Sequence, residues 1–584
     1  MITLNKFYFE PNFNGIKPIE FSKGINFIIG ERSENPTNIN EANKMNGVGK
    51  SMLIEMINFC LLKDLDNSRV SKIPLGIIPN RTYSCLEIEV ETDNRLRVVT
   101  IKRNIDEKQP IVFLEKREEK EILKADEAKK YLESIVFSES EELERPSLRS
   151  MLSLLIRDEK TSYDNILFPY LESSKSFIDA VRPHLYLFGF DLNRLDKIRL
   201  LDKRIDASTK TIKSLKEDIE KEGVSPKEIE LYLKELKDKA EKLDFSIKAL
   251  HPGESIYQYK EEIQKLESQI RKIVSEKVSK EYNARQIKSL PIVEEIDAKE
   301  VALTYNQFKS GLGDFVQKSL EQVQEFQLQV QEFQNSLMRE KLVELNKEIV
   351  DLEIKISELD EKIAGIYSKT DVSDKIGEVR LAMEMFRETN EKLERLSGIF
   401  NFYNAKKDEK KRDARNRQEE IVIFDAQITE LRGVIKSFSD DLERAHQFIV
   451  GNKICSFNLE INEKKKEFIK FDYYTNRDGS SGVNRIKTFI YDVLLMLNKN
   501  TTERHLGFLI HDNIFASAGK DDMIKSLNYL NDSLSKRGKF QYILTINKDE
   551  FESSIDGFNF NYQKKIRGTF TREKPFLNKE YREA

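Results

Sequence analysis

The 584-residue chain has no tryptophan, 13 prolines and only three cysteines, Cys60, Cys85 and Cys455. The cysteines are scattered, so they indicate neither a disulfide framework nor a thiolate zinc site, and they fit a reducing compartment. The five histidines have no metal-ligand spacing. No apolar run reaches the ~18 residues that cross a bilayer, and the first residues lack the pattern of a secretory signal. We therefore expect a cytoplasmic protein without membrane contact.

Charged residues make up 34% of the chain and aromatic residues 9%. With so few prolines, this balance favours long solvated helices over one large core. The formal net charge of −4 excludes a basic field over the whole protein, so any contact with DNA must use a local patch. The most basic helical stretch is 406–417, whose Lys and Arg side chains would bind backbone phosphate. A solvated face of a coiled coil is the alternative interpretation.

Apolar residues at alternating spacings of three and four predict a coiled coil in the middle of the chain. An outgoing arm covers 191–289 and a returning arm covers 326–449, with breaks near residues 253 and 370. The breaks are nearly symmetric, so we expect an antiparallel hairpin that folds back at an apex, 290–325, and has a joint at the breaks. A straight arm would span on the order of 140 Å. Two coiled coils that pair with other chains remain an alternative.

The seam of the returning arm is the most regular one. Its residues are Leu342, Leu345, Ile349, Leu352, Ile356, Leu359, Ile363 and Ile366, followed after the break by Ile421, Phe424, Ile428, Leu431, Ile435 and Phe438. Residues 1–190 and 450–584 instead have the shorter apolar runs of a globular α/β domain. Among them, a hairpin is predicted over 83–101, with Leu86, Ile88 and Val90 on one face.

A phosphate-binding loop is predicted between a strand that ends at Gly30 and a helix that begins near Lys50. Glycines let the backbone N–H groups converge on a polyphosphate, and the helix N-terminus adds partial positive charge. Lys50 would reach the β- and γ-phosphates of ATP, and the Ser51 hydroxyl would ligate Mg²⁺. The predicted nucleotide-binding residues are Gly30, Asn46, Gly47, Val48, Gly49, Lys50, Ser51 and Met52.

The loop departs from the strict pattern, because Lys44 stands where that pattern has glycine. We interpret Glu31–Met45 as an insertion, which costs little because the entropy of loop closure grows slowly with length. A chance Gly-Lys-Ser in a polar loop is the alternative. We expect the insertion to contact the edge of the nucleotide or a partner subunit.

ATP hydrolysis at such a loop needs a second acid for Mg²⁺, usually at the end of an apolar strand. Asp512 closes the apolar run Leu506–His511. We therefore predict that Asp512 and Ser51 hold Mg²⁺, and that His511 is buried in strand packing. An ordinary aspartate at a strand end is the alternative.

The order of these parts resembles the SMC-like ATPases of the ABC superfamily, which include SbcC, RecN and RecF relatives. The chain is most similar to bacterial SMC-like subunits whose C-terminal domain of unknown function has a His-Asp strand. Several of these occur in multi-gene anti-phage or anti-plasmid operons of the Lamassu-like kind. The resemblance covers roughly 1–190 and 450–584. It implies an α/β ABC-type head assembled from both ends of the chain, with an antiparallel coiled-coil hairpin inserted between them.

Other family positions can be matched in this sequence. Ser481 and Gly482, before an apolar helix, resemble the signature loop that contacts ATP bound to the opposite subunit. Val483 replaces the second glycine of that motif, and a plain surface turn is the alternative. Asn547 stands where the family has a switch histidine. The glutamine loop of the family has no clear match; the region 149–159 is our assignment.

The position after the Mg²⁺ acid usually holds a glutamate that polarises the attacking water. Here it is Asn513, whose amide cannot accept a proton. Lys50, Asp512 and Asn513 are the predicted catalytic positions. Hydrolysis is therefore expected to be slow or to use another acid, such as Asp521 or Asp522.

The resemblance implies a homodimer whose heads close around ATP, bind or sense double-stranded DNA without sequence preference, and signal to partner subunits. Those partners would be a small accessory protein and a nuclease-type effector in a defence complex. One alternative is a DNA-repair ATPase of the RecN or SbcC kind that works with a nuclease. Another is a coiled-coil scaffold whose ATP site is a switch without hydrolysis.

Overall fold

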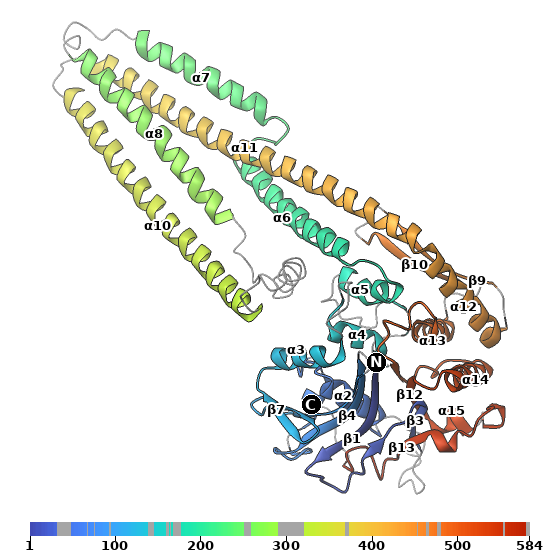
Figure 1. The fold of residues 1–584 in the computed structure, drawn as a ribbon. Coiled ribbons are helices and arrows are strands. Elements are labelled where there is room, and N and C mark those ends of the chain that lie inside the picture. The colour runs from blue at the N-terminus through green and yellow to red at the C-terminus, as the bar shows by residue number, and fades with distance from the viewer. Residues whose placement is uncertain are drawn as a thin grey trace, which may run out of the picture. The chain divides into compact units, whose positions relative to one another are not determined.

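The chain folds into two compact units (Figure 1). The head joins Met1–Arg199 to Gln418–Ala584, and the arm unit is Leu200–Arg417. The two ends of the chain therefore form one unit with the arm inserted between them, which confirms the predicted fold class. The computed structural model describes residues 1–31, 48–66, 68–74, 76–92, 95–137, 145–158, 163, 165–167, 177–249, 259–289, 320–367, 373–451, 454–462, 467–475, 480–552 and 555–579.

A five-stranded parallel sheet contains strands from both ends of the chain. Its strand order is β13 (Ile566–Phe570), β3 (Gly24–Gly30), β12 (Gln541–Asn547), β11 (Phe508–Asp512) and β8 (Ile156–Arg157). Strands buried on both faces read as continuous apolar runs, as β3 and β12 do. Because parallel strands end at the same edge of a sheet, the ends of β3, β12 and β11 meet there, with Gly30 opposite Asn547 and Asp512 opposite Thr545.

A six-stranded antiparallel sheet is built from the N-terminal segment alone. Leu86, Ile88 and Val90 are buried on one face, which confirms the predicted hairpin. The turn of that hairpin, at residues 93 and 94, lies outside the described residues. The strand order is β2 (Ile19–Glu20), β1 (Ile2–Glu10), β4 (Tyr83–Thr92), β5 (Arg95–Asn104), β6 (Ile111–Glu115) and β7 (Glu118–Ile122).

The helices of the head pack on these sheets around one shared hydrophobic core, to which both ends of the chain contribute. A separate hairpin of β9 (Cys455–Ile461) and β10 (Ile469–Thr475) packs against α12. The helices are α2 (Lys50–Cys60), α3 (Ala125–Val136), α4 (Leu148–Leu155), α5 (Phe177–Phe188), α12 (Arg432–Val450), α13 (Ser481–Leu497), α14 (Lys520–Arg537) and α15 (Lys548–Glu552), with short 3-10 turns at Arg69–Lys72, Ile555–Gly557 and Gln563–Lys565.

The arm unit is a set of antiparallel helices. Cross-arm ion pairs join Asp202 to Arg417 at 2.6 Å, Glu222 to Arg395 at 3.3 Å and Lys280 to Glu348 at 2.8 Å. The partner number falls as the outgoing number rises, so the arms run in opposite directions and the predicted hairpin is confirmed. The helices are α6 (Asn193–Lys221), α7 (Ile229–Ala249), α8 (Lys260–Ser289), α10 (Leu320–Tyr367) and α11 (Ser373–Glu430).

The seam predicted from the heptads contributes to two different cores. Ile356 and Ile363 pack with Ile270 and Val274 between α10 and α8, as a coiled-coil seam does. The later seam positions, such as Phe438 of α12, are buried in the head core instead. The same spacing therefore serves helix pairing in the arm and sheet packing in the head. The predicted apex, 290–325, lies outside the described residues except for the first turns of α10.

The arm turns back on itself between α10 and α11. Arg387 of α11 pairs with Asp360 of α10 at 2.9 Å, although 27 residues of one continuous helix would separate them by ~40 Å. Met383 of α11 also packs on Ile263 and Ile366. The chain therefore reverses direction between α10 and α11, where a joint was predicted, so the arm does not reach the ~140 Å of a straight one. Residues 368–372 lie outside the described part of the chain. Among the described residues, no helix is long and apolar enough to cross a bilayer.

Candidate nucleotide site

The phosphate-binding loop lies between the carboxyl end of β3 and the first turn of α2. Gly49 caps α2 in the left-handed region, with φ of 94°, and no side chain caps the first N–H groups of the helix. These N–H groups and the helix dipole point at the end of β3, which is the arrangement that binds a phosphate. Val48, Gly49, Lys50, Ser51 and Met52 are described, whereas Asn46, Gly47 and residues 32–45 of the insertion lie outside the described residues.

Two glycines are required by close contacts around this loop. A Cβ on Gly49 would lie 2.6 Å from the Cβ of Phe576, whose N–H donates to the carbonyl oxygen of Val48 at 3.0 Å. The segment after β13 therefore holds the loop in place. A Cβ on Gly30 would lie 2.6 Å from Nζ of Lys50, so the lysine crosses directly over the end of β3. This contact supports Gly30 as the glycine of the loop.

Lys50 reaches the end of the neighbouring strand. Its side chain is buried, and its Nζ donates to Oδ1 of Asn547 at 2.5 Å. Nδ2 of Asn547 donates in turn to Oε1 of Glu550 at 3.0 Å. Asn547, predicted at the switch-histidine position, is thus in direct contact with the lysine of the loop, and Glu550 is one hydrogen bond further.

Asp512 lies at the same edge of the sheet and is fully buried. Its carboxylate accepts a hydrogen bond from the hydroxyl of Thr545, and its carbonyl oxygen accepts one from the hydroxyl of Tyr163 at 2.6 Å. Asn513 follows with a left-handed φ of 56° and donates its N–H to Oγ1 of Thr545 at 3.0 Å. The carbonyl oxygen of Asn513 accepts from Arg485 at 2.9 Å. Asp512 and Asn513 are therefore held in place by contacts from Tyr163, from Thr545 of β12 and from Arg485 of α13.

The residues at this edge fit a magnesium ion bound together with a nucleotide. Mg²⁺ takes oxygen ligands and is usually held by one or two protein side chains plus substrate phosphates. Asp512 supplies a carboxylate, and Ser51 supplies a hydroxyl from the first turn of α2, a helix that packs against β11. In the described part of the chain no group of three or more His, Cys, Asp or Glu side chains forms a metal site of its own.

The signature-like loop begins α13. Ser480 caps this helix and accepts the N–H of Val483 at 3.3 Å, and Ser481 is exposed. A Cβ on Gly482 would lie 2.3 Å from the carbonyl oxygen of Ser517. The glycine is therefore required by packing within this chain, whatever the loop contacts outside it.

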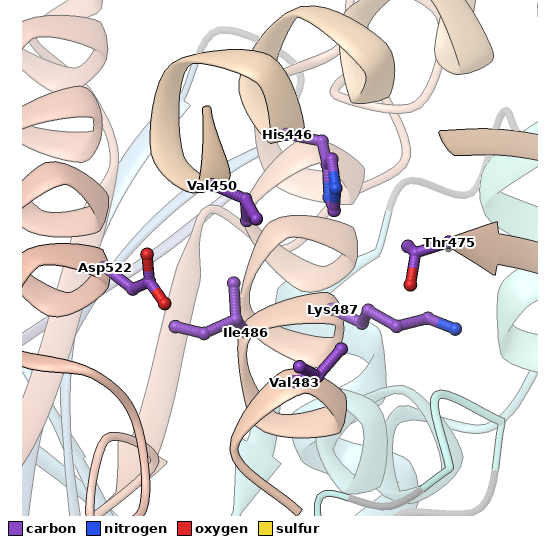
Figure 2. Close-up of a pocket in the computed structure, with 7 residues that line it drawn as sticks. All are labelled: His446, Val450, Thr475, Val483, Ile486, Lys487 and Asp522. Atoms are coloured by element: carbon purple, nitrogen blue, oxygen red, sulfur yellow. The ribbon is translucent and has the colours of Figure 1, made fainter. Parts of the chain in front are cut away.

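Asp521 and Asp522 lie in the first turn of α14. Asp522 lines a pocket of about 40 Å³, drawn in Figure 2, which has room for a water molecule or two. The pocket lies between α12, α13, α14 and β10, and Val483 and Ile486 of α13 form part of its wall. The acid that contacts Asn547 is Glu550. A catalytic role of Asp521 or Asp522 stays a prediction.

A buried polar network joins the signature helix to the strands of the site. The carboxylate of Asp492, on α13, pairs with Arg157 at 2.5 Å and contacts Nε2 of His511 at 3.0 Å. Nδ1 of His511 contacts the hydroxyl of Tyr542 at 3.0 Å. All four side chains are buried. His511 is adjacent to Asp512, so the prediction that it packs inside the sheet is confirmed.

The electrostatics of this network follow from burial and the ion pair. Burial alone would raise the pKa of the Asp492 carboxyl, but Arg157 and His511 lower it below its ordinary value. Burial lowers the pKa of His511, and Asp492 opposes that shift only in part. Asp492 is therefore an anion beside a cationic Arg157 and a neutral His511.

The basic stretch of α11 is partly neutralised within the arm unit. Lys406 pairs with Glu409 at 2.7 Å, Lys411 with Asp408 at 3.5 Å, and Arg417 with Asp202 at 2.6 Å. Exposed cationic side chains remain at Lys407, Arg412 and Arg415. The stretch is therefore a solvated helix face with a smaller positive patch, and its binding to DNA stays a prediction.

Two family models match parts of the chain. Residues 11–278 match a family described as AAA domain. The matched span includes β3, the Lys50 loop and the outgoing helices of the arm. Residues 445–574 match a second family, described as an uncharacterised protein conserved in bacteria, and this span includes Asp512 and Asn547.

Relatives extend over nearly the whole chain. The uncharacterised protein YydD of Bacillus subtilis (strain 168) is 23% identical over 562 residues, which covers 90% of each chain. The Smc head domain with a coiled coil and joint from Pyrococcus yayanosii is 14% identical and matches 96% of this chain and 94% of that chain, at a TM-score of 0.33. The Pyrococcus furiosus Smc head domain with an extended coiled coil, bound to the C-terminal domain of ScpA, is 10% identical and matches 95% and 92%, also at 0.33.

Several residues of the site are absent from the sequence prediction. Thr545, Glu550 and Tyr163 have no motif, because their role depends on which strands pair. Asp492 and Arg157 left a weak signal: Asp492 is a lone acid within the apolar stretch of α13, and an acid in such a helix must find a partner when buried. The region 149–159, assigned to the glutamine loop, contains Arg157 and the edge strand β8 beside β11.

Proposed function

We propose that the chain is an SMC-like subunit that binds and hydrolyses ATP at the edge of the parallel sheet. The observation that carries this proposal is the meeting of Gly30, Lys50 and Asp512, which come from opposite ends of the chain and converge on one helix N-terminus. An apolar strand that ends in a buried aspartate, beside a glycine loop with a lysine, is what phosphoryl transfer from a nucleotide requires. The AAA domain match over 11–278 supports the same reaction class.

Each residue has a defined task in this proposal. The N–H groups of the first turn of α2 bind the β-phosphate, and Lys50 leaves Asn547 to neutralise the γ-phosphate. Ser51 and Asp512 would hold Mg²⁺, which supplies charge neutralisation between the β- and γ-phosphates when bound. Thr545 and Tyr163 keep Asp512 in place through the two hydrogen bonds described above.

The proposal extends to a homodimer. In it, ATP on the Lys50 loop of one copy would contact the Ser481 loop of a second copy, because Ser481 is exposed and the first turn of α13 offers free N–H groups beyond the Ser480 cap. Bound ATP would then link the two heads. Head closure would let the arm unit and the patch at Lys407, Arg412 and Arg415 engage double-stranded DNA without sequence preference.

The biological role is proposed from the family resemblance alone. An SMC-like subunit of this kind would signal to a small accessory protein and a nuclease-type effector in anti-phage or anti-plasmid defence. A second candidate, an ATP switch with negligible turnover, is favoured by one specific observation. Asn513 has no proton-accepting group at the position where this family has glutamate.

ATP turnover separates these candidates. We expect the wild type to hydrolyse ATP, and Lys50→Ala and Asp512→Ala to lower the turnover by about 10²-fold or more. Lys536→Ala is the matched control, because Lys536 is an exposed lysine of α14. ATP binding without turnover in the wild type would favour the switch. Equal turnover in all four proteins would refute a hydrolytic site at this edge.

A further inference from the structure

The site lacks a proton acceptor where the family resemblance expects one. Asn513 carries an amide, and Asp522 faces the small pocket beside α12 and β10. If the proposed function is right, the water that attacks the γ-phosphate needs a carboxylate elsewhere. Such a group must lie within reach of the phosphate that Lys50 binds, and geometry is the first criterion for it.

Glu550 meets this criterion through Asn547. The side-chain amide of Asn547 is in contact with Nζ of Lys50 at 2.5 Å on its oxygen side and with Oε1 of Glu550 at 3.0 Å on its nitrogen side. Standard bond lengths put the two polar atoms of an amide about 2.3 Å apart, so the carboxylate lies no more than about 8 Å from the ammonium. A phosphoryl group and one water molecule fill a gap of this order, since the attacking oxygen lies ~3–3.5 Å from phosphorus.

The orientation of Asn547 is set by its two partners. An ammonium only donates hydrogen bonds and a carboxylate only accepts them, so the amide oxygen must face Lys50 and the amide nitrogen must face Glu550. When a phosphate oxygen takes the place of the amide oxygen at Lys50, Asn547 keeps its donor contact with Glu550. Asn547 is therefore a positioning residue that aims the carboxylate at the phosphate.

Helix α15 is tied to the end of β3 by a separate ion pair. Lys548, at the start of α15, pairs with Glu31 at 3.1 Å, and the N–H of Glu31 donates to the carbonyl oxygen of Phe570 at 2.8 Å. The helix that carries Glu550 is thus tied to the end of β3 and to β13. Glu550 is half-buried, and Oε2 of its carboxylate is covered from bulk solvent. The water that it would deprotonate must therefore be bound in the site together with the nucleotide.

We propose that Glu550 is the general base of the ATPase reaction, an inference that rests on the proposed function. In the step, the water oxygen bonds to the γ-phosphorus while the bond from that phosphorus to the β–γ bridging oxygen breaks. The water proton passes to the Glu550 carboxylate, and the leaving electron pair stays on ADP. The proton then goes to the inorganic phosphate or to solvent, which restores the carboxylate.

The test compares Glu550→Gln, Glu550→Asp and the wild type. The amide introduced by Glu550→Gln retains a contact to Asn547 but cannot take a proton, so we expect turnover to fall by about 10²–10³-fold while binding of a non-hydrolysable ATP analogue stays within about twofold. Glu550→Asp should recover part of the turnover, since it restores the carboxylate at a shorter reach. Asp556→Asn, at an exposed acid after α15, is the control and should keep wild-type turnover.

The outcomes distinguish this inference from the proposed function. Turnover that depends on Lys50 and Asp512 but survives in Glu550→Gln would overturn the role of Glu550 and leave the ATPase intact. Loss of analogue binding in Glu550→Gln would show a structural role instead of a base. A wild type without Lys50-dependent turnover would overturn the ATPase and the base together.

Discussion

The buried ion pair between Arg157 and Asp492 offers a sharp test of how the head is held together. Replacing Asp492 with alanine leaves the Arg157 guanidinium, which is 0% exposed, with an uncompensated charge. Breaking a buried pair in this way costs about 3–5 kcal/mol. The same change removes the partner of Nε2 of His511, one residue before Asp512. We therefore expect both the stability of the head and the placement of Asp512 to suffer.

The expected size of the effect follows from the size of the head, which has about 370 residues. Unfolding entropy near 60 °C is ~2.1 cal/mol/K per residue, so 1 kcal/mol shifts the melting temperature of a head this large by about 1.3 °C. The loss of 3–5 kcal/mol then lowers the melting temperature by roughly 4–6 °C. Thermal unfolding followed by circular dichroism measures this shift.

A double variant separates charge from packing. Arg157→Met with Asp492→Leu removes both charges and keeps apolar volume, and buried pairs replaced in this way often lose little stability. We expect the double variant to melt closer to the wild type than Asp492→Ala does. Two results would refute the reasoning about an uncompensated charge. One is a shift of the melting temperature below about 1 °C in Asp492→Ala. The other is a double variant whose loss of stability equals the summed losses of Arg157→Met and Asp492→Leu made singly.

Two further predictions concern pH and the arm. Burial lowers the pKa of His184 and of His505 to about 3, whereas the pKa of an unfolded histidine is ~6.5. Between these two values only the unfolded chain takes up the protons. The stability of the head should therefore fall on acidification below pH ~6.5, by ~2 kcal/mol per histidine at pH 5. Denaturant unfolding at pH 7.5 and 5 checks this, and equal midpoints would contradict it. In the arm, Asp360→Cys with Arg387→Cys should be joined by a short bis-maleimide, since the native pair is 2.9 Å apart and all three native cysteines are buried. Asp360→Cys with Arg415→Cys is the control, and equal cross-linking of both pairs would argue against the reversal.

Local patterns in the sequence determined much of the fold. Spacings of three and four predicted the helices of the arms because a helix repeats every 3.6 residues, whatever it packs against. The near symmetry of the breaks predicted that the arms run antiparallel. A glycine loop between an apolar strand and a helix predicted the Lys50 site, and an apolar run closed by an acid predicted Asp512. Both motifs need only neighbouring residues, and the pairing of β3 with β12 brings them to one sheet edge.

Only the tertiary structure decided which distant side chains meet. Lys50 and Asn547 are 497 residues apart, and Arg157 and the Asp492 carboxylate that it contacts are 335 apart. Such contacts depend on the order and register of the strands, which no local period encodes. The sequence also did not determine the direction of the arm after its break. Heptads determine which face of a helix is apolar, but they do not determine the angle between the helices on either side of an interruption. The sequence therefore determined the loop lysine and the strand acid, and the register of β12 determined that Asn547 and Glu550 stand beside them.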